Sequence, residues 1–427
     1  MSSIAILLVL AIIPWLLSKQ KDSWRFFRHL SVVFLNLFVI EIVVYGFFLF
    51  QIHKGDVFFL IDNQKGLDYL IKHKIVSMTH LSQSRHNAFY QVDNELGYTV
   101  GRDKMYEIYA SSNQGLRSRK DYSLMPREDI LRIAAFGDSF VFCDGEPLPQ
   151  TWEYYLENMV ENLEVMNFGV SGYGLGQSYL RYLKDGLRYH PDIVLFNYVR
   201  TGPRDGLSAD EVVNNGLGTS SLYRVYFWIH EDILKSKNVT PSDFFKKDFR
   251  DQFVYEPLGL SMDQSVWASR IFSVSNVGLF VKQIALKRIF QKAVSTKKQD
   301  DLEKKRDRAI NFKILQNLLK TAKANKMIVI FFCGDEFFNL PAETQLLLRR
   351  YSDWAVYINS NKVLAELFAF NNTTRENLLN STGHFNGNGN FLYAQAVAGI
   401  LMRRAWGDGD RRFEFDVKKK IFINKGK

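Results

Sequence analysis

Residues 132–140, with the sequence RIAAFGDSF, decide the fold that the rest of the chain is expected to adopt. Arg132–Phe136 predicts a short apolar strand, and Gly137 permits a tight turn directly after it. Ser139 then lies at the entrance of a helix, where its hydroxyl is exposed and backbone N–H groups can face a developing negative charge. A reactive group is thus predicted at the carboxyl end of a strand, where open α/β sheets collect their functional groups.

Strands and helices alternate from about residue 130 onward. Further strands are expected at 165–168, 193–198 and 327–333, and helices at 153–163, 177–189, 309–325, 342–370 and 388–404. Strands separated by helices favour a parallel sheet that is covered on both faces. Residues 203–308 interrupt the alternation with aromatic and charged stretches, and we expect them to form a largely helical insertion.

The composition narrows the function classes. The chain of 427 residues is 47% hydrophobic and 15% aromatic, which excludes a disordered protein. The net charge is +10, but the basic residues are scattered and no nucleic-acid motif accompanies them, so no nucleic-acid partner is expected. The histidines show no metal-ligand spacing, and we predict neither a metal nor a cofactor. Cys143 and Cys333 are expected to act as small apolar residues in or beside buried strands.

Two apolar runs near the N-terminus predict a membrane anchor within residues 1–52. Residues 4–17 are short for a full span, whereas residues 31–50 have the length that a bilayer requires. The loop between them is basic, with Lys19, Lys21, Arg25 and Arg28. Because basic loops stay in the cytoplasm, one or two transmembrane helices would place the remainder on the periplasmic or extracellular side of the inner membrane.

Glu41 stands within the second apolar run. An ionisable group inside a span is costly and often marks a polar partner, so contact with other membrane subunits is one interpretation. The other is a protonated or snorkelling carboxyl close to the outer headgroups. Beyond the anchor, residues 53–129 are expected to form a membrane-proximal lead-in with short strands, and residues 406–427 a basic tail.

Two further segments carry chemically suggestive residues. Gly169 follows the second strand in the segment Asn167–Gly169, where its N–H is a candidate donor to an oxyanion. His384 precedes the last helix, where its imidazole is a candidate base for a serine. The order of the three segments, from the first strand end to the start of the last helix, makes the assignments mutually supporting.

Four stretches of the chain carry a family resemblance: Leu131–Phe140, Glu164–Gly174, Pro191–Leu195 and Gly383–Asn386. They resemble the motifs of the SGNH (GDSL-type) hydrolase superfamily, best of all its bacterial membrane-tethered members, over roughly residues 130–405. The resemblance implies a flavodoxin-like three-layer α/β/α sandwich and ester chemistry through an acyl-enzyme. It also implies that Ser139 is the nucleophile, His384 the base, and the N–H groups of Ser139 and Gly169 the oxyanion donors.

The chain departs from the family pattern in two places. Thr201 and Gly202 stand where an Asn-Asp pair is expected, which removes an oxyanion donor worth about 10²–10³ in rate. Thr201 or Asn197 is a candidate replacement for that donor.

The second departure concerns the acid that orients the histidine. Ser381 and Thr382 stand where the family has an aspartate, and loss of that member can cost about 10⁴ in rate. Asp335 and Glu336, just after the strand that ends at Cys333, are candidate carboxylates for this role. The other interpretation is that they are ordinary loop residues.

Three functions are compatible with these residues. The first is an outward-facing esterase or O-acyltransferase that acts on acyl esters of cell-envelope polysaccharide. The second is a catalytically degenerate SGNH domain that serves as a structural or binding subunit of a membrane complex; the two departures, Glu41 and the aromatic segment 223–228 favour it. The third is a lipase, with Phe280 and its neighbours covering a lipid pocket.

Overall fold

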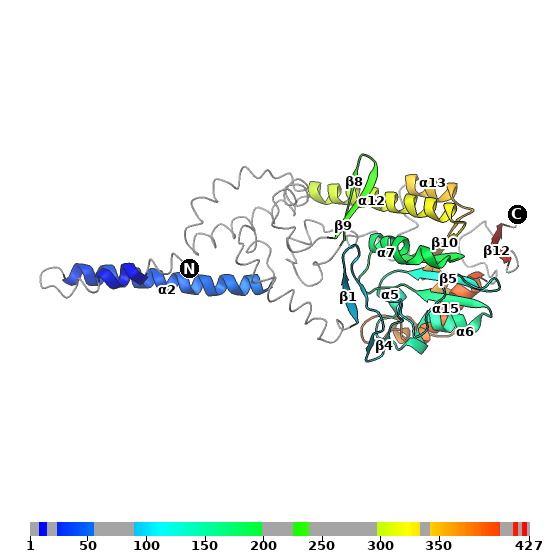
Figure 1. Cartoon of the computed structure of the whole chain (residues 1–427), viewed down its shortest axis with the longest axis horizontal. Coiled ribbons are helices and arrows are strands. Elements are labelled where there is room, and N and C mark those ends of the chain that lie inside the picture. The colour runs from blue at the N-terminus through cyan, green and yellow to red at the C-terminus, as the bar shows by residue number, and fades with distance from the viewer. Residues whose placement is uncertain are drawn as a thin grey trace. The chain divides into compact units, whose positions relative to one another are not determined.

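The computed structural model describes residues 8–14, 24–54, 89–198, 225–238, 297–333, 342–401, 413–416 and 421–424. They belong to two compact units. One unit contains the N-terminal helices, and the other contains the sheet and its covering helices (Figure 1). We consider each unit by itself.

The first unit contains one helix that is long and apolar enough to cross a membrane, counted over the described residues. Helix α2 (Trp24–Lys54) includes the stretch Arg28–Phe47, with a mean hydropathy of 2.2 and most of its side chains exposed. Its length fits either a membrane anchor or a signal sequence. Glu41 is only 3% exposed. Of the first apolar run, residues 8–14 are described and helical.

The second unit is built on a five-stranded parallel sheet, as the alternating pattern predicted. The strand order is β11-β10-β7-β5-β6, and the strands are β5 (Leu131–Phe136), β6 (Leu163–Asn167), β7 (Ile193–Tyr198), β10 (Ile328–Cys333) and β11 (Ala355–Asn359). Ala135 of β5 pairs with Leu195 on one side and Asn167 on the other. The carboxyl ends of β5, β6 and β7 therefore lie at one edge of the sheet.

Alternate residues of each strand face opposite layers, which is why the strands are apolar throughout. On one face, Phe136, Phe196 and Phe331 pack with helices α7 (Leu175–Arg181), α12 (Lys297–Ala324) and α13 (Ala342–Arg350). On the other face, residues such as Ile133 and Leu195 pack with α6 (Trp152–Met159), α14 (Ser360–Phe370) and α15 (Gly387–Leu401). Figure 1 shows α7 and α12 above the sheet and α6 and α15 below it.

The helix expected over 342–370 is wrong. The structure divides this region into α13, the strand β11 and α14. The segment Ala355–Asn359 is rich in β-branched and aromatic residues, and it pairs in parallel with β10 from Val329 to Cys333. Pairing with a strand that is already buried outweighs the helical pattern on either side.

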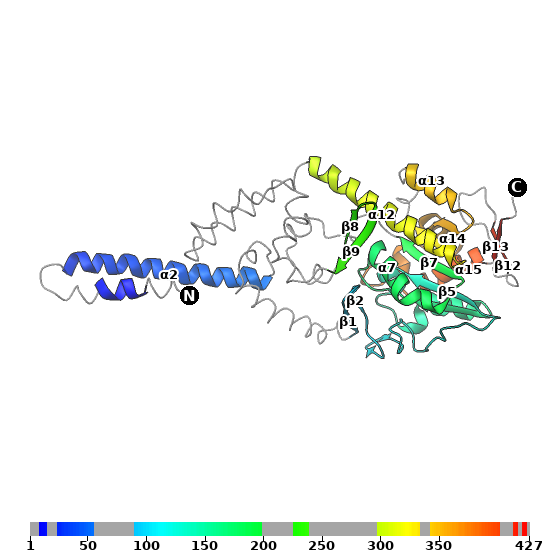
Figure 2. The ribbon, with the colours of Figure 1, turned by 45° about the horizontal axis from the view of Figure 1, so that its top comes forward.

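The insertion 203–308, expected to be largely helical, contains a pair of strands in the part that is described before α12. Strands β8 (Val225–His230) and β9 (Ile233–Asn238) form an antiparallel hairpin. The ring of Phe227 packs against Gly176 of α7, where a β-carbon would come within 2.4 Å of the ring. Figure 2 shows the hairpin beside α12. Residues 203–224 and 239–296 lie outside the described part, and the prediction for them stays open.

The lead-in, described from residue 89, forms part of the sheet unit. It contains two small hairpins, β1 (Tyr90–Asp93) with β2 (Gly97–Val100) and β3 (Met105–Tyr106) with β4 (Tyr109–Ala110). Their buried residues pack against Phe142, which belongs to the short helix α5 (Ser139–Phe142). In the predicted tail, the described residues pair as strands β12 (Phe413–Asp416) and β13 (Ile421–Asn424).

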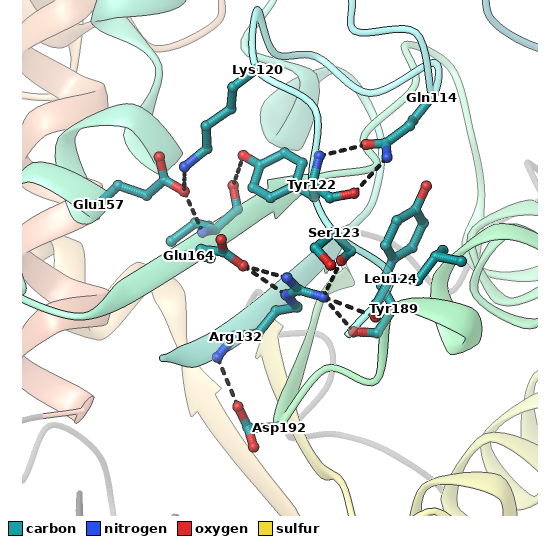
Figure 3. A network of polar contacts seen from close by, with 11 residues as sticks. Gln114, Lys120, Tyr122, Ser123, Leu124, Arg132, Glu157, Glu164, Tyr189 and Asp192 are labelled. Atoms are coloured by element: carbon teal, nitrogen blue, oxygen red, sulfur yellow. Dashed lines mark hydrogen bonds and ion pairs between the residues drawn. The ribbon is translucent and has the colours of Figure 1, made fainter. Parts of the chain in front are cut away.

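Arg132, at the amino end of β5, forms hydrogen bonds with the end of the lead-in (Figure 3). Its buried guanidinium forms an ion pair with Glu164 at 2.6 Å. It also donates to the carbonyl oxygens of Ser123 and Tyr189, at 2.8 and 2.7 Å. The backbone N–H of Arg132 donates to a carboxylate oxygen of Asp192 at 2.8 Å. This end of β5 is therefore held by an ion pair and several hydrogen bonds.

Candidate active site

Ser139 begins α5 directly after β5. The Asp138 side chain caps this helix by accepting the Phe140 N–H at 3.0 Å. Gly137 is required for the turn, because a β-carbon there would lie 2.5 Å from the Val141 side chain. Ser139 is 9% exposed, so the turn holds its hydroxyl at the edge of the sheet in a largely enclosed position.

His384 lies in the loop before α15 and faces Ser139. Its Nε2 is 2.8 Å from the Ser139 Oγ, although the two residues are 245 positions apart in the sequence. The ring of Phe140 packs against the imidazole with 5.1 Å between centroids. The structure thus brings together the two residues that sequence analysis predicted as nucleophile and base.

The other nitrogen of His384 meets a hydroxyl. Thr382 Oγ1 lies 2.9 Å from Nδ1, and Asn380 Oδ1 lies 2.6 Å from the same hydroxyl. Thr382 therefore occupies the position behind the imidazole for which Asp335 and Glu336 were candidates. Those two residues lie outside the described part of the chain, and their role stays a prediction.

Asn380 was not singled out from the sequence, although a local signal for it exists. Asn380, Thr382 and His384 alternate along the chain, and the turn that contains them is closed by an Asn380 N–H donated to the His384 carbonyl oxygen at 2.8 Å. Asn380 Nδ2 also donates to Glu146 Oε1 at 3.0 Å. Glu146 comes from a distant segment, and nothing in its local sequence indicates this contact.

The predicted oxyanion donors differ in their availability. The Ser139 N–H has no hydrogen-bond partner within the described part of the chain. The Gly169 N–H, in contrast, donates to Asn167 Oδ1 at 2.8 Å. Gly169 is also tightly packed, since a β-carbon would approach the Phe142 nitrogen to 2.4 Å. In this arrangement only the first of the two N–H groups is available to a substrate oxygen.

The side-chain donor that was expected near Thr201 is not described, because residues 199–224 lie outside the described part. Asn197, the other candidate, is half-buried near the end of β7. The β-carbon of Asn197 lies 3.1 Å from the position that a β-carbon on Gly137 would take. Asn197 is therefore close to the turn that carries Ser139, and its role as a donor stays a prediction.

A buried acid and a buried thiol lie behind the site. Burial raises the pKa of Glu153 well above its usual range, which favours the neutral form of this carboxyl. Burial also raises the pKa of the Cys143 thiol, and the neighbouring Glu153 raises it further. The Cys143 Sγ lies 3.6 Å from Glu153 Oε2. A thiol that stays protonated is a poor nucleophile, so Cys143 does not compete with Ser139.

No protein-family model and no curated protein matches the chain. Solved structures do match. One match is described as a lipolytic protein of the G-D-S-L family from Desulfitobacterium hafniense DCB-2, at 14% identity and a TM-score of 0.29 over 64% of this chain and 99% of that chain.

Two other matches have similar values. The esterase EstA from Pseudoalteromonas sp. has 10% identity and a TM-score of 0.29 over 63% of this chain and 94% of that chain. A catalytic mutant of Axe2, an acetylxylan esterase from Geobacillus stearothermophilus, has 12% identity and a TM-score of 0.29 over 65% and 96%. Identities and TM-scores this low carry no argument about this chain, and the case for a function rests on the contacts within it.

Proposed function

We propose that this protein is a serine esterase or O-acyltransferase of the SGNH type. The observation that carries the proposal is the 2.8 Å contact between Ser139 Oγ and His384 Nε2 at the carboxyl edge of the sheet. A hydroxyl and an imidazole at hydrogen-bond distance form the nucleophile and base of acyl transfer. The N–H of Ser139 supplies one donor to the oxyanion.

The reaction follows from this geometry in two halves. Ser139 Oγ attacks the acyl carbonyl while its proton passes to His384 Nε2. The imidazolium then returns this proton to the leaving alkoxide, and the acyl group remains on Ser139. Water or a sugar hydroxyl next attacks the acyl-enzyme and gives its proton to His384. Ser139 recovers a proton from the same imidazolium as it departs.

For the substrate we propose acyl esters of cell-envelope polysaccharide. The support is the apolar helix Arg28–Phe47, preceded by a basic segment, which favours an anchored domain on the outer side of the inner membrane. The lipid bilayer is then a partner of α2. Proteolysis of intact spheroplasts tests the side: exposure of the sheet unit to added protease is expected, and full protection would contradict it.

The chemistry is tested with the full-length protein in detergent. We expect hydrolysis of p-nitrophenyl acetate and covalent labelling by a fluorophosphonate, both lost in Ser139→Ala and strongly reduced in His384→Ala. Ser352→Ala and the exposed His230→Ala are matched controls at sites away from the contact, and they should behave as the unmodified protein does. Folded protein that neither labels nor hydrolyses esters would refute the enzyme.

Two observations favour a second candidate, a catalytically degenerate domain that acts as a structural or binding subunit of a membrane complex. His384 is backed by a neutral hydroxyl in place of a carboxylate, and the Gly169 N–H is engaged by Asn167. Both features lower the expected rate. Absence of labelling, together with co-purification of other membrane proteins through α2, would support this candidate.

A further inference from the structure

The side-chain amide of Asn380 has one possible orientation. Its Oδ1 accepts the backbone N–H groups of Thr382 and His384, at 3.0 and 3.2 Å. Its Nδ2 donates to the Asp144 carbonyl oxygen at 2.9 Å and to Glu146 Oε1 at 3.0 Å. A flipped amide would place its NH₂ group against two N–H donors and its oxygen against two acceptors. Asn380 Oδ1 is therefore fixed as an acceptor.

This orientation decides the direction of the next hydrogen bond. A hydroxyl has one proton to donate and can accept others. Because Asn380 Oδ1 only accepts, the Thr382 hydroxyl donates its proton to that oxygen across the 2.6 Å contact. The same hydroxyl is then left to accept from His384 Nδ1 at 2.9 Å.

The tautomer of His384 follows in turn. In a neutral imidazole one nitrogen carries the proton and the other accepts. With the proton on Nδ1, the Nε2 that faces Ser139 is the unprotonated acceptor, which is the form that a general base requires. Each step is set by the previous one, starting from two backbone N–H groups.

We infer that Asn380 and Thr382 are positioning residues that hold His384 in its reactive tautomer, a role that rests on the proposed function of Ser139 and His384. They form a neutral relay in place of an orienting carboxylate. A threonine suits the relay because one hydroxyl both accepts from Nδ1 and donates to Asn380 Oδ1. An aspartate at this position would have no proton to offer that oxygen.

Asn380 joins the relay by hydrogen bonds to the loop that follows α5. Gly145 makes the close approach possible, since it has a φ of +88° and a β-carbon there would lie 2.4 Å from Asn380 Nδ2. Glu146 is 6% exposed, and its carboxylate is the end point of the relay. The loop of His384 and the loop after α5 are thus joined through Asn380, which fixes the distance between base and nucleophile.

Thr382→Val removes the hydroxyl and keeps the shape of the side chain. We expect kcat for acetyl-ester hydrolysis to fall about 10- to 100-fold, with KM changed by less than about twofold. This loss is smaller than the roughly 10⁴-fold loss of a triad carboxylate, because the hydroxyl supplies orientation without charge. Thr382→Ser, which keeps the hydroxyl, should restore most of the rate.

The matched control is Thr151→Val. Thr151 is a buried threonine whose hydroxyl caps α6 by accepting the Tyr154 N–H at 3.3 Å. Its loss should lower stability but leave kcat unchanged. An active protein in which Thr382→Val has the same kcat as the unmodified chain would overturn the relay while leaving the esterase intact.

A readout without turnover keeps the two proposals separate. Nitrogen-15 NMR of histidine-labelled full-length protein, with His384 assigned by its loss in His384→Gln, reports which ring nitrogen carries the proton. We expect a protonated Nδ1 in the unmodified protein and a mixture of tautomers in Thr382→Val. A protonated Nε2 in the unmodified protein would refute the relay whether or not the protein hydrolyses esters. Absence of activity with the expected tautomer would refute only the enzyme.

Discussion

The two ends of strand β5 differ in how their polar groups are arranged. At the amino end, the buried charge of Arg132 is matched by the carboxylate of Glu164 and by several carbonyl oxygens. At the carboxyl end, Ser139, His384 and Thr382 form a chain of hydrogen bonds without a matched charge. A buried ion pair supported by hydrogen bonds resists change, whereas a proton-transfer site needs groups whose hydrogen bonds can be exchanged. Stability should therefore depend on the first end and activity on the second.

The largest effect is expected from Ser139→Ala. Removal of the nucleophile should lower kcat for ester hydrolysis by about 10⁴- to 10⁶-fold. The free energy of unfolding should change by less than about 1 kcal/mol, because the hydroxyl contacts only His384 among the described residues. Steady-state kinetics and urea unfolding measure the two quantities. A large loss of stability with little loss of rate would reverse the assignment of the two ends.

Arg132→Ala should have the complementary effect. Removing one partner of a buried ion pair costs about 3–5 kcal/mol, since Glu164 would be left without its cation. Urea unfolding followed through the buried Trp152 should show this loss, while kcat of the folded fraction stays near that of the unmodified protein. The control is Arg127→Ala, an exposed pair with Asp129 that should change stability by less than about 0.5 kcal/mol. Equal effects of the two substitutions would contradict the comparison.

A pH-dependent effect tests the buried acid at the carboxyl end. Burial raises the pKa of Glu153 in the folded protein above its value in the unfolded chain. Above about pH 4.3 the unfolded state releases a proton that the folded state keeps, so stability falls as the pH rises through this window. Glu153→Gln removes this pH dependence. The free energy of unfolding of this variant, relative to that of the unmodified protein, should rise by about 1.4 kcal/mol per pH unit until the folded carboxyl titrates.

Urea unfolding of the unmodified protein and of Glu153→Gln at pH 4 and pH 8 measures the difference. The exposed Glu161→Gln is the matched control on the segment that follows α6, and it should show no comparable pH dependence. A difference between Glu153→Gln and the unmodified protein that is the same at both pH values would show that the carboxyl is charged in the fold.

Local sequence was sufficient for the elements that depend on local patterns. The apolar strands β5 and β7 and the positions of Ser139 and His384 at the sheet edge follow from runs of apolar residues that end in turns. Strand β11 was missed because it has only five residues and lies between two segments with a helical pattern. Its identity comes from pairing with β10, a contact between distant parts of the chain.

In the candidate site, too, local sequence indicates some features, whereas contacts between distant residues could not be predicted from it. The alternation of Asn380, Thr382 and His384 is visible in the sequence, but the contact from Asn380 to Glu146 joins residues 234 positions apart. Gly169 illustrates a different limit. A glycine after a strand is compatible with a free N–H donor or with close packing of two backbones, and only the position of Phe142 distinguishes them.

The smallest effect is expected at a partly exposed ion pair, Asp93 with Lys184, which serves as a reference for both ends of β5. Burial alone would raise the pKa of Asp93, but hydrogen bonds from Lys184 and from the N–H groups of Leu96 and Glu95 hold it below its ordinary value. A lowered pKa stabilises the fold above the pKa of the unfolded chain, about 3.9, and this contribution disappears as the pH falls through the folded pKa. Asp93→Asn should therefore cost less than about 1 kcal/mol at pH 7 and nothing once the pH lies below the folded pKa.

A double-mutant cycle with Lys184→Met isolates the ion pair, whose nitrogen lies 2.8 Å from the nearest Asp93 oxygen. We expect a coupling free energy of about 0.5 kcal/mol at pH 7, because both side chains are partly exposed and water screens the attraction. Added salt should reduce it further. A coupling as large as the loss in Arg132→Ala would mean that burial is not what separates the amino end of β5 from an ordinary surface pair.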